Sequence, residues 1–248
     1  MNITRRAFCA LVPCVLAGCA LNQRAAADTV LVSQPTVANA ANVGLGFYSS
    51  SQARPTRNYK RGDDFTLASN SSITSVRWWG LSEGRIFDDL RNFNQYTLEI
   101  FEGAAAPGGP LPGPRLWSST FTPASLSITA TGRTSPTSGA AEHLYQANLA
   151  SAVSLTGGKA YILAISARCI NASGDAWQWQ DGEFFGGHGA NFSYASGTWT
   201  SFEDTDSAFE LIGTVVPAPS TAAVLLTLAA MPAGRRARPS SFARTCQA

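Results

Sequence analysis

Short runs of alternating apolar and polar residues recur through the middle of the chain. Residues 96–100 and 145–149 each place an apolar side chain at every second position. Successive side chains of a strand point to opposite faces, so this period of two predicts strands that bury one face. The same alternation, or a short apolar run, occurs at 29–32, 64–67, 73–79, 177–179 and 209–211.

Tyr161–Ile165 is apolar on both faces, which predicts a central strand covered on both sides. Stretches rich in Gly, Pro or small polar residues separate the runs, and residues 104–114, 129–141 and 181–189 are expected to be loops. Residues 81–93 could form a turn or two of helix. Many short strands joined by such turns predict an all-β fold, a single antiparallel β-sandwich that is jelly-roll-like.

The two ends of the chain have a different pattern. Near the C-terminus the apolar run 222–231 is followed by Arg235, Arg236 and Arg238. A helix needs about 20 residues to cross a membrane, so this run is short for a span, although the arginines resemble a positive stop. A C-terminal helix buried in the core is the alternative interpretation.

At the N-terminus Arg5 and Arg6 precede an apolar run that ends at Leu21. A basic start, an apolar stretch and the small residues 25–27 are typical of a secretory signal peptide cleaved after Ala27. The arginine pair also resembles a twin-arginine export signal. Residues 16–19 look like a lipobox, in which Cys19 would be lipidated instead.

The segment from Val216 to Arg238 resembles the PEP-CTERM sorting signal of bacterial exported proteins. Its motif consists of Val216, Pro217, Pro219 and Ser220, and it is followed by the apolar run and the arginine cluster. The chain departs from the family pattern at Ala218 and in the tail 239–248. The resemblance implies recognition by an exosortase-type processing enzyme and membrane attachment before processing. Together with the predicted signal peptide and strands, it divides the chain into a signal peptide (1–27), a β-sandwich domain (28–215), a sorting segment with an anchoring helix (216–238) and a short tail (239–248).

Net charge changes once these ends are set aside. Residues 28–215 hold 11 Lys and Arg against 16 Asp and Glu, a net charge of −5. An acidic body argues against nucleic-acid binding, which requires a basic surface. Cys169 is the domain's only cysteine, so an internal disulfide is excluded there, and its apolar neighbours predict that it is buried.

Six tryptophans are candidate ligand-binding residues, because sugar rings stack on indole faces. Trp177 and Trp179 are two residues apart and so point to the same side of a strand, while Trp78 and Trp79 point to opposite sides. Trp177, Trp179 and Trp79 are therefore the tentative platform for a glycan. Burial in the sandwich core is the alternative for each of them.

Acidic residues gather at several positions, and Glu203, Asp204 and Asp206 are the candidate calcium ligands. Oxygen ligands suit calcium, although a solvated acidic loop explains the same residues. Asp63 and Asp64 form another acidic pair. A structural calcium ion is the one cofactor that these acidic residues suggest.

Catalytic signatures are weak. The chain has two histidines and lacks a Gly-x-Ser-x-Gly motif, and no carboxylate pair is singled out for glycoside hydrolysis. The sequence therefore predicts a non-catalytic protein that is exported and kept at the cell envelope, outer surface or extracellular matrix, with polysaccharide as an expected partner. A carbohydrate-active hydrolase or lyase on the same fold is the alternative.

Overall fold

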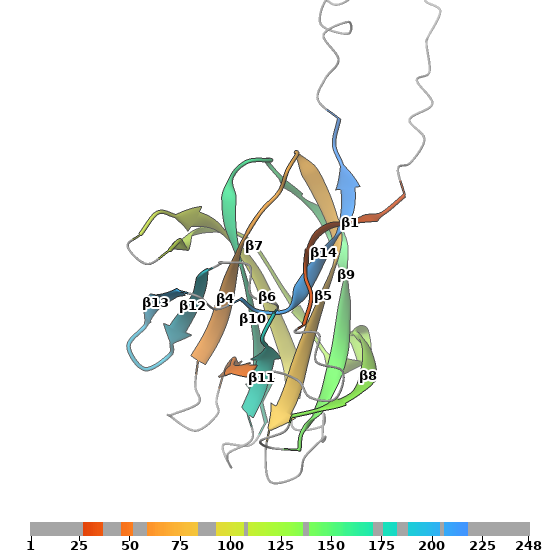
Figure 1. Cartoon of the computed structure of the whole chain (residues 1–248), viewed down its shortest axis with the longest axis vertical. Coiled ribbons are helices and arrows are strands. Elements are labelled where there is room, and N and C mark those ends of the chain that lie inside the picture. The colour runs from red at the N-terminus through yellow and green to blue at the C-terminus, as the bar shows by residue number, and fades with distance from the viewer. Residues whose placement is uncertain are drawn as a thin grey trace, which may run out of the picture.

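The structure, a computed structural model, describes residues 27–36, 46–51, 59–83, 93–106, 109–135, 139–170, 176–182, 188–203 and 206–217. Their regular elements are fourteen β-strands and one 3₁₀ turn, Pro123–Ser125. The strands form two seven-stranded sheets that pack face to face as a sandwich (Figure 1). The predicted all-β sandwich is confirmed.

The first sheet is organised around β5 (Ser71–Glu83). β9 (Ala141–Leu155) lies along one side of β5, and β14 (Phe209–Val215) then β11 (Ala176–Gln180) lie along the other. β1 (Thr29–Gln34) pairs with β14, β8 (Ser127–Thr134) with β9, and β2 (Gly46–Tyr48) with β11. All of these pairings are antiparallel.

The second sheet runs in the order β13 (Thr198–Glu203), β12 (His188–Ser193), β4 (Tyr59–Thr66), β10 (Ala160–Cys169), β6 (Phe93–Ala104) and β7 (Leu111–Phe121). β3 (Ser50–Ser51) adds a short parallel pairing to β10. Ser49 links the sheets, because its amide donates to the Trp177 carbonyl and its carbonyl accepts from the Ala167 amide, both at 2.9 Å.

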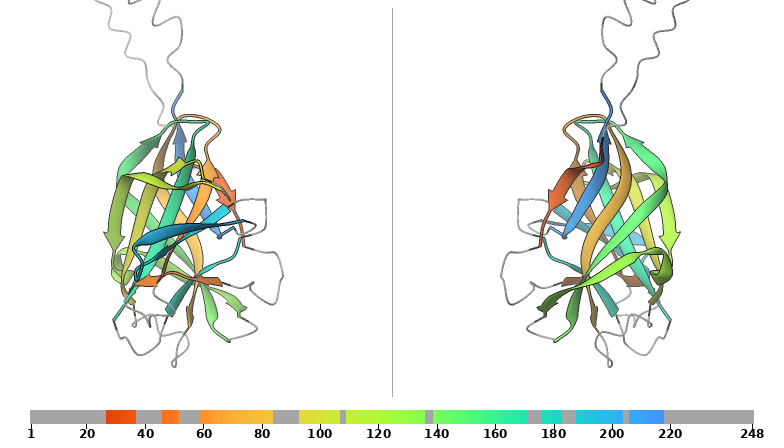
Figure 2. Two further views of the ribbon diagram at one scale, coloured as in Figure 1. Left: turned by 90° about the vertical axis from the view of Figure 1, so that its left-hand side faces the viewer. Right: turned by 90° about the vertical axis from the view of Figure 1, so that its right-hand side faces the viewer.

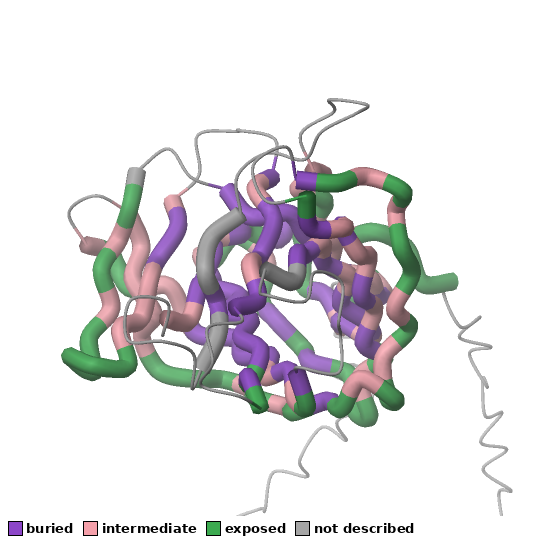
Figure 3. The backbone as a smooth tube through the Cα atoms, turned by 90° about the horizontal axis from the view of Figure 1, so that it is seen from below, coloured by how far each residue is buried: buried purple, intermediate pink, exposed green. Residues whose placement is uncertain are grey.

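Aromatic rings fill the space between the two sheets. The rings of Trp78 and Tyr145 stack with their centroids 5.4 Å apart, and the edges of Tyr96 and Trp177 complete the group. Seen along the sandwich, the buried residues lie inside a rim of exposed ones (Figure 3). Cys169 is buried among them, as predicted.

β10 is covered on both faces, which confirms the prediction for residues 161–165. Tyr161, Leu163 and Ile165 face the main core, whereas Ile162 and Ala164 are buried on the outer face of the second sheet. Phe101 and Trp199 provide that outer cover. The second sheet therefore has a small apolar cluster of its own on the side away from the first sheet.

Two loop predictions are wrong. Residues 127–134 form β8, although residues 129–141 were expected to be irregular. Residues 111–114 belong to β7 despite Pro112 and Pro114. β7 is an edge strand, where a proline need not supply a hydrogen bond to a second neighbour. β5 continues to Glu83, and the helical turn expected within 81–93 otherwise falls on residues 84–92, outside the described part.

Antiparallel pairing brings the start of β1 next to the end of β14, with Thr29 opposite Gly213. Both ends of the sandwich domain therefore leave it at one pole, here called the exit pole (Figures 1 and 2). The signal peptide, Cys19 and residues 218–248 lie outside the described residues. Among the described residues, no helix has the length and apolarity to cross a membrane.

Candidate functional site

The proposed tryptophan platform is not on the surface. Trp177 and Trp179 point to the same side of β11, as expected, but that side is the core, and both indoles are entirely buried. The Trp179 Nε1–H donates to the Ala208 carbonyl at 2.9 Å. Trp79 is only half-buried but faces outward from β5, on the other side of the sheet. These three residues therefore do not form one glycan-binding surface, because core packing takes two of them.

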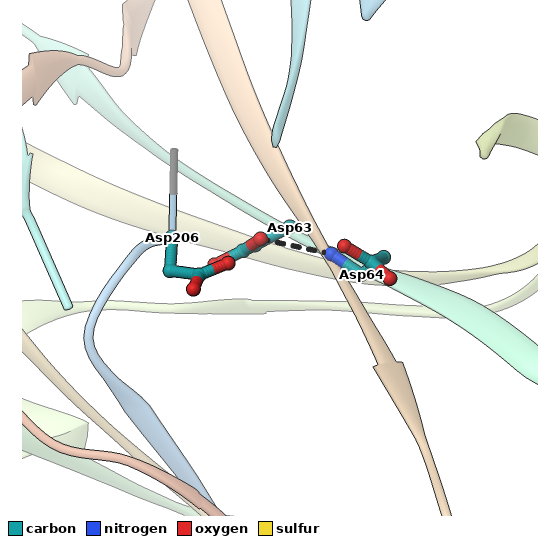
Figure 4. Close-up of side chains that lie close together, drawn as sticks. All are labelled: Asp63, Asp64 and Asp206. Carbon is teal, nitrogen blue, oxygen red and sulfur yellow. Dashed lines mark hydrogen bonds between the residues drawn. The ribbon is translucent and has the colours of Figure 1, made fainter. Parts of the chain in front are cut away.

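The structure describes the candidate calcium ligands at 203–206 only in part. Glu203 ends β13, Asp204 lies outside the described residues, and Asp206 is buried before β14. Asp206 lies beside Asp63 and Asp64 of β4, and each of these three carboxyl groups has an oxygen within 4.8 Å of the others (Figure 4). We call this cluster, with Arg61 and Asp181, the acidic corner.

Alternation along β4 explains why these charges are buried. Phe65 faces the core, so Arg61 and Asp63, at every second position before it, also point inward. The Arg61 guanidinium lies over Gly189 of β12, where a Cβ atom would come within 2.0 Å of its Nη2. Arg61 also donates to Asn191 Oδ1 at 3.3 Å and to the Ser207 hydroxyl at 3.4 Å.

Backbone amides hold the Asp63 carboxylate. Its Oδ1 accepts from the Asp64 amide at 3.0 Å, the bond drawn in Figure 4, and its Oδ2 accepts from the Ser207 amide. The Asp64 carboxylate accepts from the His188 amide at 2.6 Å. The corner thus joins β4, the start of β12 and the segment before β14.

Burial dominates the electrostatics of the acidic corner. Desolvation raises the pKa of Asp63 well above its usual range, and the nearby Arg61 opposes that shift. Desolvation also raises the pKa of Asp64, and it raises the pKa of Asp181 to about 7. Conversely, burial lowers the pKa of Arg61, against the attraction of Asp63, Asp181 and Asp206.

The chemistry of the corner is that of a buried ionic network. Its carboxylate oxygens are of the type that binds calcium, yet Arg61 already supplies a positive charge and backbone amides occupy both oxygens of Asp63. A hydrolase would need two carboxyl groups that face substrate across a cleft, whereas Asp63 and Asp206 are buried. Calcium binding at Glu203, Asp204 and Asp206 stays a prediction.

A second feature is the hairpin of β12 and β13, which the sequence analysis did not identify. Phe192 and Trp199 lie opposite each other in it, so they share one face, and their rings are 5.3 Å apart. The Lys60 ammonium lies 5.2 Å from the Phe192 ring centroid and 5.4 Å from that of Trp199. Lys60 also pairs with the buried carboxylate of Glu99.

The other face of this hairpin is directed away from the outer cluster. It carries the opposed pairs Gly189 and Phe202, Asn191 and Thr200, and Ser193 and Thr198. Phe202, Thr200 and Thr198 are exposed. We call this surface the free face of the hairpin. Residues 189–202 include no charged side chain, and this signal, with Gly197 in the turn, is visible in the sequence.

The start of the sorting motif lies at the exit pole. Val216 and Pro217 are exposed, and the Val216 amide donates to the Asn70 carbonyl at 2.8 Å. Pro219, Ser220 and the three arginines fall outside the described residues. The sorting signal therefore stays a prediction, beginning directly where the sandwich ends.

These features define an antiparallel β-sandwich with a buried acidic corner and an edge hairpin whose residues 189–202 carry no charge. Residues 33–212 match the family model of a domain of unknown function, DUF7901, and the chain belongs to this family. The matched region begins in β1 and ends in β14, so the family domain corresponds to the sandwich. Searches of the curated proteins and of the solved structures found no match.

Proposed function

We propose that this protein is an exported, non-catalytic β-sandwich that is kept at the cell envelope or in the extracellular matrix, where it acts among polysaccharides. The exit pole is the observation that carries the proposal. Both chain ends leave the domain there, through β1 and β14. A domain tethered at a single pole keeps its other surfaces, including the β12–β13 hairpin, accessible to a partner.

The two ends supply the proposed address. An export signal at residues 1–27 and a sorting segment at 216–238 would act in sequence, the second through an exosortase-type enzyme. The apolar residues 222–231 begin shortly after Pro217, the last described residue. The folded domain would thus stand close to the membrane before processing.

Cell fractionation of a truncated protein tests this proposal. A chain that ends at Pro217 retains all of β14 and the bond from the Val216 amide to Asn70. We expect it to fold like the full chain but to move from the envelope fraction to the soluble exported fraction. The variant Cys19→Ser, in the full chain, is the matched control and is expected to remain in the envelope.

The opposite result would be equally informative. If the truncated chain stays in the envelope as the full chain does, the C-terminal segment is not the anchor. Loss of envelope association in Cys19→Ser alone would assign retention to lipidation of Cys19. Thermal unfolding of the truncated protein checks that its fold is retained.

A further inference from the structure

We propose that the free face of the β12–β13 hairpin binds a neutral polysaccharide, with the Phe202 ring as the stacking surface. This inference rests on the proposed function and specifies its ligand and site. Phe202 is 42% exposed, although it is a large apolar side chain. Few large apolar side chains are exposed among the described residues, and Phe202 is one of them. Its ring lies at one end of a strip along β13 whose other members, Thr200 and Thr198, are polar.

The surroundings of Phe202 hold its ring in place before a ligand arrives. The Arg61 guanidinium carbon lies 6.0 Å from the ring centroid, and Arg61 itself is entirely buried. Gly189, opposite Phe202 across the hairpin, leaves the room that the guanidinium occupies. A ring supported in this way loses little conformational freedom on binding, which favours affinity.

Polar groups continue the strip beyond the ring. Thr200 and Thr198 follow Phe202 at every second position of β13, and Asn191 lies opposite Thr200. The Asn191 side-chain oxygen accepts from Arg61, so its NH₂ group, on the other side of the amide, is directed away from the guanidinium. From 198 to 202 the strip extends roughly 13 Å, at about 3.3 Å per residue, which is long enough for more than one sugar ring.

The absence of charge in this segment selects the ligand class. Residues 189–202 hold hydroxyl and amide groups and no Asp, Glu, Lys or Arg. An acidic polysaccharide would need exposed cations here, whereas a neutral sugar needs an apolar ring for its C–H face and uncharged donors and acceptors for its hydroxyl groups. The hairpin supplies the second combination.

The packed face of the hairpin keeps this surface rigid. Trp199 and Phe192 fasten the hairpin to the outer cluster, and Tyr194 packs against Phe192 at 5.4 Å with the ring planes at 90°. In the described part of the chain β13 pairs with β12 alone, so it is an edge strand. A second copy of the chain could pair with such an edge, and the experiment below must distinguish it from a glycan.

The test uses the full chain and its variants on an oligosaccharide array that carries cello-, xylo- and mannohexaose together with alginate and hyaluronan oligomers. We expect binding to at least one neutral hexaose. Phe202→Ala should weaken that binding about tenfold or more, as loss of a central aromatic contact does. Phe202→Trp should retain it. Leu116→Ala, which truncates a residue that is 49% exposed on β7, is the matched control and should bind like the wild type.

Thr200→Glu is a second variant that leaves the ring intact. It places a charge on an exposed position of the strip and should also weaken binding, without removing any buried group. Thermal unfolding of each variant shows whether the fold is retained. If Phe202→Ala does not fold, Thr200→Glu alone decides the outcome.

Four results would overturn the inference. If a neutral hexaose binds but neither variant weakens it, the site is elsewhere and the proposed function stands. If only alginate or hyaluronan binds, the ligand class is wrong. If no oligosaccharide binds, the site has no glycan ligand, and fractionation decides the proposed function separately. If Phe202→Ala abolishes a dimer seen by light scattering, the free face belongs to a second copy.

Discussion

Arg61 is the residue on which the acidic corner depends. It is entirely buried, and its charge faces Asp63, Asp181 and Asp206. A buried ionic network contributes little net stability compared with a well-packed apolar one, but removing one partner leaves the others uncompensated. The free energy of unfolding should therefore fall far more on loss of Arg61 than on loss of an exposed arginine.

The variant Arg61→Met removes the charge and keeps most of the side-chain volume. We expect the free energy of unfolding to fall by about 3–5 kcal/mol, because Asp63 stays buried without its opposite charge. Urea denaturation measures the change. Arg115→Ala is the control, since Arg115 is 58% exposed and its pairing with Glu99 should contribute less than about 1 kcal/mol. Equal losses in the two variants would contradict the assignment.

Asp181 predicts a dependence of stability on pH. Its pKa is about 7 in the folded protein and near 4 in the unfolded chain. Stability from the protonated form is therefore complete below about pH 4 and is lost as pH rises towards 7. The asparagine of Asp181→Asn does not ionise, so this variant does not lose stability in that way. The free energy of unfolding of Asp181→Asn minus that of the wild type should therefore increase between pH 5 and pH 8, by roughly 1–3 kcal/mol.

Urea unfolding of both proteins at these two pH values measures that difference. Glu102→Gln is a suitable control, because Glu102 is only partly buried, at the far end of β6. The Glu102→Gln protein is unfolded in urea at the same two pH values for comparison. A difference for Asp181→Asn that is the same at pH 5 and pH 8 would show that Asp181 is ionised in the folded protein at both.

At the scale of the element, the β12–β13 hairpin has two different faces, one packed on the outer cluster and one exposed. Trp199 covers Ile162 and Ala164, which would otherwise be exposed apolar positions on the outer side of the second sheet. Trp199→Ala should therefore cost roughly 3 kcal/mol of unfolding free energy by urea denaturation. Leu116→Ala should stay within about 0.5 kcal/mol of wild type. A small effect for Trp199 would mean that the hairpin is not fastened by this contact.

Sequence periodicity predicted the strands that bury one face in the core. It failed where the position of a strand in the sheet determines which residues are tolerated. Residues 96–100 and 145–149 alternate because one face lies in the core, and both lie within strands as expected. The start of β7 was predicted to be a loop because it contains Pro112 and Pro114. These prolines are tolerated because β7 lies at the edge of the sheet. Nothing local indicates that Asp206 meets Asp63, because 143 positions separate them and pairing across the sandwich brings them together.

The tryptophans illustrate the same limit. The spacing of Trp177 and Trp179 correctly indicates one shared side, but it does not tell whether that side is core or solvent. The packing of β11 against the second sheet decides it, because Trp177 contacts Tyr96 of β6 there. The uncharged segment 189–202 is also visible in the sequence, but it begins beside the glycines around 182–189, which predicted a loop.

At the scale of the whole molecule, the family domain and the sandwich nearly coincide, and the proposed targeting segments lie beyond both. The acidic corner and the β12–β13 hairpin belong to the second sheet and the segments next to it, whereas β1 and β14, the first and last strands, belong to the first sheet. The proposed attachment would thus involve one sheet and the proposed ligand surface the other. Variants in the hairpin should therefore leave localisation unchanged.

The place of β14 also determines how the domain would respond to mechanical force. β14 lies between β1 and β5 and is antiparallel to both, and its last residue, Val215, lies at the exit pole. Force transmitted from a surface anchor would thus load two hydrogen-bond ladders in shear, so that many bonds would have to break together. A domain held by its C-terminal strand and pulled through a bound polymer would resist unfolding far better than one whose anchored strand could be unzipped bond by bond.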